Sequence, residues 1–197
     1  MADNLDEKLV VGVASSALFD LSESHAVFLN SPLSEYRRYQ REKEDEQLAP
    51  GAAFPLVKRL LRLDDAICGG ADSSVEVILL SHNDPDSGQR IMNSIESHGL
   101  RIPHAIFVNG GDPYSYIENL NCALFLSANA RDVVDAIERG YPAGRVFPTQ
   151  FTDEDDDMEL RIAFDFDGVL ADDSSEKVYI DKGLSAYLES EDARADE

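Results

Sequence analysis

Short apolar runs alternate with amphipathic segments along most of this chain, and that alternation limits what the chain can fold into. The apolar runs have the length of buried strands, and the segments between them carry apolar residues at helical spacing. The predicted strands are 8–15, 75–80, 105–108 and 122–126, with an edge strand at 145–147. The predicted helices are 33–46, 54–67, 86–98 and 130–139. Strands that alternate with helices form a parallel sheet with helices on both faces, so we expect a Rossmann-like α/β fold.

In an open parallel sheet, ligands bind at the carboxyl ends of the strands. The residues that follow the predicted strands are Ala14–Ala17, Ser81–Asp84, Asn109–Asp112 and Ser127–Asn129. Among these, Ser81, His82 and Asn83 are candidate substrate contacts, and the amides of Gly110 and Gly111 could cradle a phosphate. Each has a plainer alternative, since a loop histidine is often a surface residue and a glycine pair is often only a turn.

The net charge of −22 restricts the possible partners. A nucleic-acid backbone requires a basic surface, so we expect no nucleic-acid partner. A small phosphorylated substrate remains possible, because a bound metal ion can reverse the field inside one cleft. The plain explanation for the acidity is solubility, including adaptation to high salt.

Other features of the composition indicate a cytoplasmic protein. No apolar stretch approaches the roughly 20 residues that span a bilayer, so no membrane association is expected. The acidic first residues lack the basic and apolar regions of a signal peptide. Cys68 and Cys122 form neither a CxxC motif nor a disulfide framework.

An acidic run, Asp153–Asp157, divides the chain into two parts. It follows Pro148 and lacks periodicity, so we interpret it as a solvated linker rather than a metal site. We therefore predict an α/β domain over 1–150, a linker over 151–158, and the start of a second, similar unit over 159–197. The second unit is expected to open with a strand over 159–164.

An internal repeat supports this division. At an offset of 151 residues, 11–46 aligns with 162–197 without a gap, with seven identities in 36 positions. The identical positions in the first copy are Ser24, Val27, Leu33, Ser34, Tyr36, Asp45 and Glu46. The interpretation is a duplicated α/β unit, and the alternative is a chance likeness between two strand–loop–helix segments.

The two copies differ at two positions that matter for chemistry. Asp165 aligns with Ala14, and Asp167 aligns with Ser16. Alternation along a strand puts Asp165 and Asp167 on the same side, and Gly168 permits a turn after them. A buried carboxylate is costly unless it is paired or binds a metal, so this pair is a candidate catalytic and metal site.

Two such carboxylates can divide the work of phosphoryl transfer. One attacks phosphorus, and the other donates a proton to the leaving oxygen and then activates water. Magnesium, which prefers oxygen ligands, would offset the repulsion between carboxylate and phosphate. The alternatives are a calcium loop, which needs more oxygen ligands over about twelve residues, and a loop with only a structural role.

The segment Asp165-Phe-Asp-Gly-Val169 resembles the first motif of the haloacid dehalogenase superfamily of phosphatases. A series of further segments, in this order, is similar to the cytosolic 5′-nucleotidase type I family. Those segments are Ala14–Asp20, Glu35–Tyr39, Pro50–Phe54, Leu80–Asn83, Arg90–Ile95, Asn109–Gly111 and Leu124–Ala128. They cover nearly the whole chain and are more specific than the Asp-x-Asp alone.

The resemblance implies a haloacid dehalogenase-like fold and Mg2+-dependent hydrolysis of nucleoside 5′-monophosphates, AMP foremost. It implies that Asp165 is the nucleophile and a metal ligand. It also implies that Asp167 is the general acid/base, and that its backbone carbonyl binds the metal.

The superfamily pattern also includes a Ser or Thr, a Lys and a distal acidic pair after the Asp-x-Asp. Only 30 residues follow Asp167, and these groups are not among them, so the chain looks truncated in its catalytic half. Ser81 stands at the second-motif position of the first copy, and Ser127-Ala-Asn129 stands where the acidic pair would be. We expect such a fragment to be weakly active or inactive by itself.

Two further hypotheses remain open. The first copy could be a non-catalytic module that binds a nucleotide or forms a dimer, or the enzyme could act on sugar phosphates. The sequence is compatible with a homo-oligomer but does not define one.

Overall fold

The computed structural model describes residues 5–68, 73–149, 157, 159–165 and 174–194. The chain divides into two compact units, Met1–Leu160 and Arg161–Glu197, each described here by itself. Among the described residues, no helix combines the length and the apolar character that crossing a membrane requires.

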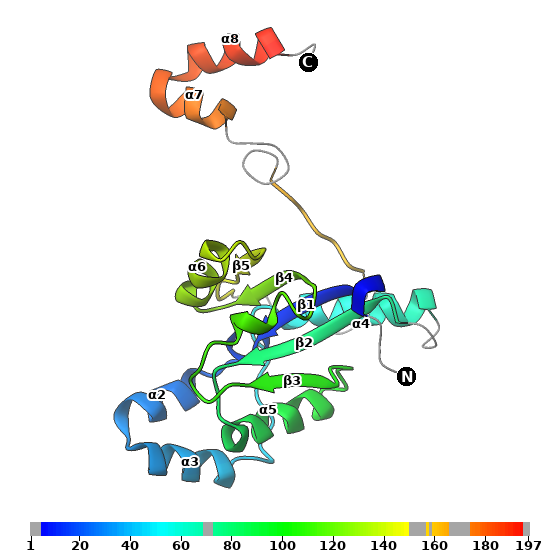
Figure 1. The fold of residues 1–197 in the computed structure, drawn as a ribbon, viewed down its shortest axis with the longest axis vertical. Helices are drawn as coiled ribbons and strands as arrows, with labels where there is room; N and C mark the ends of the chain where they lie inside the picture. Colours follow the sequence, from blue (N-terminus) through cyan, green and yellow to red (C-terminus); the bar gives the residue numbers. More distant parts are fainter. Residues whose placement is uncertain (1–4, 69–72, 150–156, 158, 166–173, 195–197) are drawn as a thin grey trace. The chain divides into compact units, whose positions relative to one another are not determined.

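The first unit contains a five-stranded parallel sheet (Figure 1). Its strands are β1 (Leu9–Ala14), β2 (Val75–Ser81), β3 (His104–Phe107), β4 (Cys122–Ser127) and β5 (Ala143–Arg145). The order is β3-β2-β1-β4-β5, and all neighbouring pairs are parallel. The central strand β1 pairs Val11 with Val77 of β2 and with Leu124 of β4. The predicted parallel α/β sheet is confirmed.

The helices of the first unit fill the connections between these strands. They are α1 (Ser15–Leu18), α2 (Ser22–Asn30), α3 (Leu33–Glu42), α4 (Phe54–Cys68), α5 (Pro85–Ser97) and α6 (Ala130–Glu138), with 3-10 turns η1 (Leu5–Glu7) and η2 (Tyr114–Tyr116). The chain runs outward from β1 to β3 on one side and from β4 to β5 on the other. Because such crossovers are right-handed, the two runs leave their helices on opposite faces of the sheet.

The core lies where the apolar strands meet these helices. Val10, Val13 and Leu79 are fully buried in the central strands. From the helices, Val57 of α4 and Ile91 of α5 are buried in the same cluster. The continuous apolar runs that predicted buried strands therefore form the centre of the sheet.

In the first unit, the predicted elements agree with the structure except at three places. The edge strand predicted at 145–147 lies at Ala143–Arg145. The predicted helix over 33–46 ends at Glu42, where the chain turns at Lys43. Helices α1 and α2 were not predicted. α2 contains one buried residue, Ser24, so it shows little of the apolar periodicity that sequence analysis uses.

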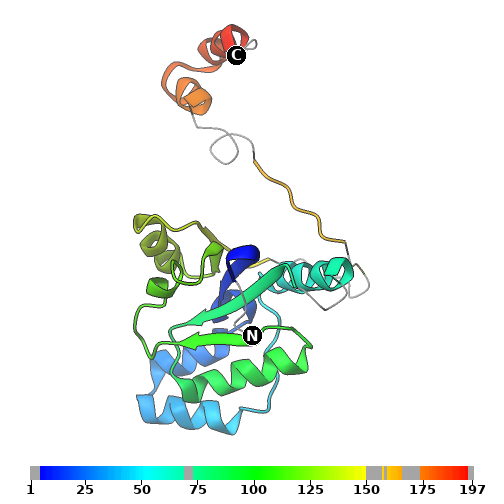
Figure 2. The ribbon, with the colours of Figure 1, turned by 45° about the vertical axis from the view of Figure 1, so that its right-hand side comes forward.

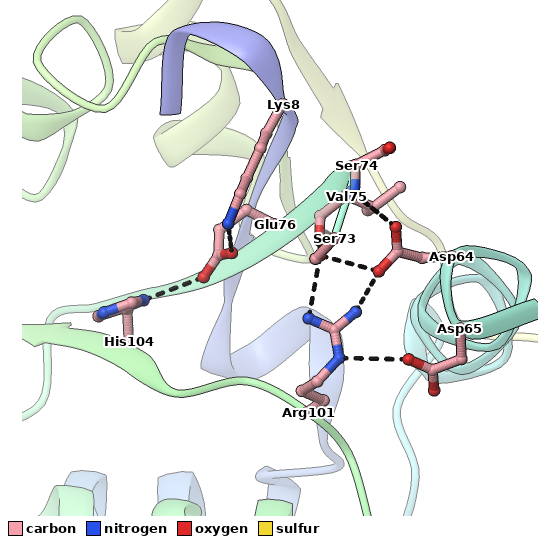
Figure 3. A network of polar contacts seen from close by, with 9 residues as sticks. All are labelled: Lys8, Asp64, Asp65, Ser73, Ser74, Val75, Glu76, Arg101 and His104. Atoms are coloured by element: carbon pink, nitrogen blue, oxygen red, sulfur yellow. Dashed lines mark hydrogen bonds and ion pairs between the residues drawn. The ribbon is translucent and has the colours of Figure 1, made fainter. Parts of the chain in front are cut away.

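The amino ends of β2 and β3 are tied together by two buried carboxylates, shown in Figure 3. Asp64 of α4 accepts hydrogen bonds from the amides of Ser74 (2.7 Å) and Val75 (3.0 Å) and from the Ser73 hydroxyl (2.8 Å). Arg101 forms an ion pair with it. Burial alone would raise the pKa of the Asp64 carboxyl, but these hydrogen bonds and the Arg101 charge lower it.

The second carboxylate of this edge is Glu76, which is 3% exposed. Lys8 donates to it over 3.1 Å, and the Nδ1 atom of His104 lies 3.0 Å from its other oxygen. Both carboxylates of this edge therefore have charged or amide partners from neighbouring segments.

Candidate functional site

A cavity of about 1350 Å³ lies at the carboxyl edge of the sheet in the first unit. Its floor includes the ends of β1, β2 and β4, and its walls include residues of α2, α3, α4 and α5. The floor residues are Ala14, Ser15, Ser16, Leu80, Ser81, His82, Asn83, Asp84, Asn109, Gly110, Ala128, Asn129 and Asp132. β1 and β4 flank the point where the strand order reverses, which is where open α/β sheets bind ligands.

Two buried hydroxyls lie side by side on this floor. The Oγ atoms of Ser15 and Ser81 are 3.0 Å apart, and the Ser81 hydroxyl also accepts a hydrogen bond from the Asn83 amide. The structure thus places the predicted contacts Ser81 and Asn83 in the cavity lining.

His82 is the centre of a polar network. Its Nδ1 atom lies 2.8 Å from the carbonyl oxygen of Gly111, and its Nε2 atom lies 3.1 Å from the Tyr114 hydroxyl. Nε2 also lies 3.4 Å from Asp132. The interaction with Asp132 raises the pKa of His82 above its ordinary value. The ring is 43% exposed, as expected of a surface histidine, but it has partners within the protein.

Asp132 anchors this network from the first turn of α6. It is 5% exposed, accepts from the Ser127 hydroxyl at 2.8 Å, and accepts from the Asn129 side chain at 2.9 Å. Burial favours the neutral acid, but hydrogen bonds, that of His82 foremost, lower the pKa of Asp132. Sequence analysis missed Asp132. The signal was present as Asn129-x-x-Asp132, an N-cap residue followed by an acidic residue at the third helical position.

The glycine pair forms a turn whose amides are used inside the protein. Gly110 has a φ of +79°, and its amide donates to the His82 carbonyl. The Gly111 amide donates to the Val108 carbonyl. Gly110 borders the cavity, but these bonds favour the turn interpretation over a phosphate cradle.

Tyr114 is buried and packs edge-on against Phe125, with ring centroids 5.6 Å apart. The ring is therefore part of the packed core of the first unit. Burial, together with the Asp132 carboxylate, raises the pKa of its hydroxyl, which keeps that hydroxyl protonated.

A helical hairpin forms one wall of the cavity. α2 and α3 lie together beside α5 (Figure 2, blue to cyan beside green). Phe28 of α2 contacts Tyr36 of α3 edge-on, with ring centroids 5.3 Å apart, and both line the cavity. Gly51 also lines the cavity. A side chain there would lie 2.6 Å from the backbone oxygen of Ala17, so glycine is required for this close approach.

In the second unit, Asp165 is described and exposed, whereas its partner Asp167 lies outside the described residues. The predicted strand over 159–164 is wrong, because no strand is assigned to 159–165. Ile162 and Phe164 are 52% and 64% exposed. A strand needs a neighbour to pair with, and the described part of the second unit contains none.

No group of three or more His, Cys, Asp and Glu side chains in the described ranges could hold a metal ion. Of the two predicted magnesium ligands, Asp165 lies within the described residues and Asp167 lies outside them. A carboxylate oxygen suits magnesium, so the donor chemistry of that residue fits the predicted ion.

The described helices of the second unit repeat the hairpin of the first. α7 (Ser174–Lys182) and α8 (Leu184–Arg194) pack together, as α2 and α3 do (Figure 1). Tyr179 contacts Tyr187 edge-on at 6.1 Å. In the alignment at an offset of 151 residues, these two residues correspond to Phe28 and Tyr36, so the same aromatic contact occurs in both copies. This match supports a duplication over a chance likeness.

Comparisons with known proteins identify the family of this chain. The family model described as 5′-nucleotidase matches residues 1–197. Human cytosolic 5′-nucleotidase 1B is 30% identical over 185 residues, which cover 92% of this chain and 30% of that protein. The chain thus spans about a third of the length of this curated relative.

Among solved structures, two of the haloacid dehalogenase (HAD) domain of the effector protein Lem4 from Legionella pneumophila are similar. One, an inactive mutant, has a TM-score of 0.41 and 15% identity, and the other has a TM-score of 0.39 and 16% identity. Each match covers 73% of this chain and 88% of the Lem4 domain. Similarity at this level carries no argument about function. The family model, in contrast, matches from the first residue to the last, and the chain belongs to the 5′-nucleotidase family.

Proposed function

We propose that the protein hydrolyses nucleoside 5′-monophosphates, AMP foremost, to a nucleoside and phosphate. The observation that carries this proposal is the Asp165-x-Asp167 pair in a chain that matches the 5′-nucleotidase family along its whole length. The human relative supports it, since it is named a cytosolic 5′-nucleotidase. That name also supports a cytoplasmic location.

In the proposed reaction, a carboxylate oxygen of Asp165 attacks the phosphorus atom of the substrate. The bond from phosphorus to the 5′ oxygen breaks, and an aspartyl phosphate forms. Asp167 gives its proton to the departing nucleoside oxygen and then takes a proton from water. That water attacks the phosphorus of the aspartyl phosphate, which releases inorganic phosphate and restores Asp165.

Asp165 and Asp167 would hold a magnesium ion through their oxygen atoms. The ion, when bound, would reduce the repulsion between the Asp165 carboxylate and the substrate phosphate. The first unit is not assigned this chemistry, since Ala14 and Ser16 stand where the second copy has its two acids.

The test is phosphate release from AMP with magnesium, measured on the protein at its natural full length. Asp165→Asn should lower the rate at least about a thousandfold while the circular dichroism spectrum is unchanged, because an amide cannot replace the nucleophile. Asp181→Asn removes an exposed carboxylate from α7 of the same unit and should leave the rate within about twofold.

Full activity in Asp165→Asn would refute the proposed nucleophile. A panel of sugar phosphates, run beside AMP, tests the substrate class. A rate on a sugar phosphate above the rate on AMP would refute the nucleotide assignment.

A further inference from the structure

We propose that the cavity of the first unit binds a nucleoside monophosphate without hydrolysing it. The ligand class rests on the proposed function, because it is taken from the substrate of the second copy. The cavity is lined by residues of the first unit, and a nucleotide there would make this unit a nucleotide-binding module within the same chain.

The duplication is the first argument. The two copies share the helical hairpin and its aromatic contact, Phe28 with Tyr36 in one and Tyr179 with Tyr187 in the other. In the first copy this hairpin forms a wall of the cavity over the end of β1. The end of β1 corresponds in the alignment to the Asp165-x-Asp167 segment. The cavity therefore occupies the position in the first copy that the catalytic residues occupy in the second.

The shape and lining of the cavity are the second argument. Its volume of about 1350 Å³ exceeds the roughly 300–1,000 Å³ of common small-molecule sites, so a nucleotide has room. Apolar and aromatic side chains such as Phe28, Leu33 and Phe54 line it, together with the strand-end residues Ser15 and Ser81. An apolar region suits a base, and hydroxyls suit a sugar or a phosphate.

Side chains of both charge signs line the cavity, and the basic ones could pair with an anionic ligand. Four basic side chains line it, namely His25, Lys58, His82 and Arg90. Arg90 is 5% exposed, and its Nε atom donates to the Glu46 carbonyl. Asp132 raises the pKa of His82 and so favours its cationic form. Two of the four, Lys58 and Arg90, belong to the 17 Lys and Arg of a chain that has 39 Asp and Glu.

The three carboxylates that line the cavity are each held by local structure. Asp20 accepts from the Ser22 amide. Asp84 caps α5 through Ser87 and is paired with Arg37, and Asp132 is held by Ser127 and His82. None stands at the position of the two catalytic acids, which Ala14 and Ser16 occupy. Binding without hydrolysis is the expected result.

The test places a charge at the cavity. Ser16 is partly exposed and lines the cavity, so Ser16→Asp puts a carboxylate there, and Ser16→Asn is the neutral control of nearly the same size. Both changes are made in the 197-residue chain that also carries Asp165→Asn, which removes the proposed nucleophile. AMP, adenosine and inorganic phosphate are titrated by calorimetry, and the ring signals of His82 are followed by NMR.

We expect AMP to bind with a shift of the His82 signals. Ser16→Asp should weaken AMP at least about tenfold through repulsion of the phosphate, and it should change adenosine binding by less than about threefold. Ser16→Asn should keep AMP within about threefold of the parent chain.

Three results would overturn the proposal. The first is the absence of both binding heat and a shift of the His82 signals at millimolar AMP. The second is an equal loss of AMP affinity in Ser16→Asp and Ser16→Asn. The third is inorganic phosphate that binds as tightly as AMP. The proposal would also be overturned if Ser16→Asp left AMP affinity unchanged while a chain with Asp165→Ala in place of Asp165→Asn no longer bound AMP. That result would place the nucleotide in the second unit. The hydrolysis assay with Asp165→Asn fails or succeeds independently of these outcomes, so the two proposals are separable.

Discussion

The two edges of the sheet in the first unit both contain buried carboxylates, but they use them differently. At the amino edge, Asp64 and Glu76 are held by amides and by the cations Lys8 and Arg101 (Figure 3). At the carboxyl edge, Asp132 is paired with His82 beside a cavity of about 1350 Å³. One edge joins segments of the chain to one another, and the other borders space that a ligand can enter.

The difference shows that a buried acid is not by itself a sign of catalysis. Asp64 is as buried as any acid in the described residues, and its partners are backbone amides and an arginine. Those partners hold the start of β2 against α4. We therefore expect mutations at the amino edge to change the free energy of unfolding, and mutations at the carboxyl edge to change ligand binding as well.

The largest expected effect is on stability, at Asp64. Asp64→Ala should lower the free energy of unfolding by about 3 kcal/mol, because it leaves the amides of Ser74 and Val75 and the Arg101 charge without their acceptor. Denaturation in urea measures this loss. Asp65→Ala is the matched control, since Asp65 also pairs with Arg101 but is 56% exposed, and it should cost less than about 1 kcal/mol. Equal losses in the two variants would contradict the structural role of the amino edge.

A smaller effect is expected at Asp132. Asp132→Asn should destabilise the protein by about 1–2 kcal/mol, because the amide cannot accept every hydrogen bond that the carboxylate accepts. It should also lower the pKa of His82, which an NMR titration of the ring measures. Asp135→Asn removes a more exposed carboxylate from the same helix, 41% exposed, and should change neither quantity appreciably. An unchanged pKa of His82 in Asp132→Asn would contradict an ion pair between His82 and Asp132.

The smallest effect is the pH dependence that His82 adds. The folded protein raises the pKa of His82, so the charged ring stabilises the fold below its ordinary pKa, near 6.5, and this contribution is lost as pH rises through the folded pKa. His82→Gln should therefore reduce stability more at pH 6 than at pH 9. The difference should be below about 1 kcal/mol, because the ring is 43% exposed and solvent screens the pair.

Melting temperatures at the two pH values test this prediction. In the Asp132→Asn background the pH difference should disappear, since the main cause of the pKa shift is gone. A difference that persists there would assign the pH dependence to another group.

Much of the first unit was predictable because its strands are continuous apolar runs. Val77–Leu80 is an uninterrupted apolar run, and in the structure every residue of β2 after the first is buried. The residues after each strand could also be predicted as ligand-binding positions, because open parallel sheets bind ligands there. Several of these residues line the cavity.

The rest depended on contacts between residues that are far apart in the sequence. His82 and Asp132 are separated by 50 positions, and only the strand order brings them together. The strand expected over 159–164 failed for the opposite reason. Its apolar pattern is local, but a strand also needs a partner, and none is present in the described part of that unit.

The edge-on contact of Phe28 with Tyr36 bears on the order in which the two copies evolved. Because Tyr179 and Tyr187 make the same contact, the simplest history places the hairpin in an ancestor that existed before the duplication. The side chains at 14 and 16 and at 165 and 167 diverged afterwards. On this account the two copies differ by two acids at the end of one strand, and both contain the hairpin with its aromatic contact.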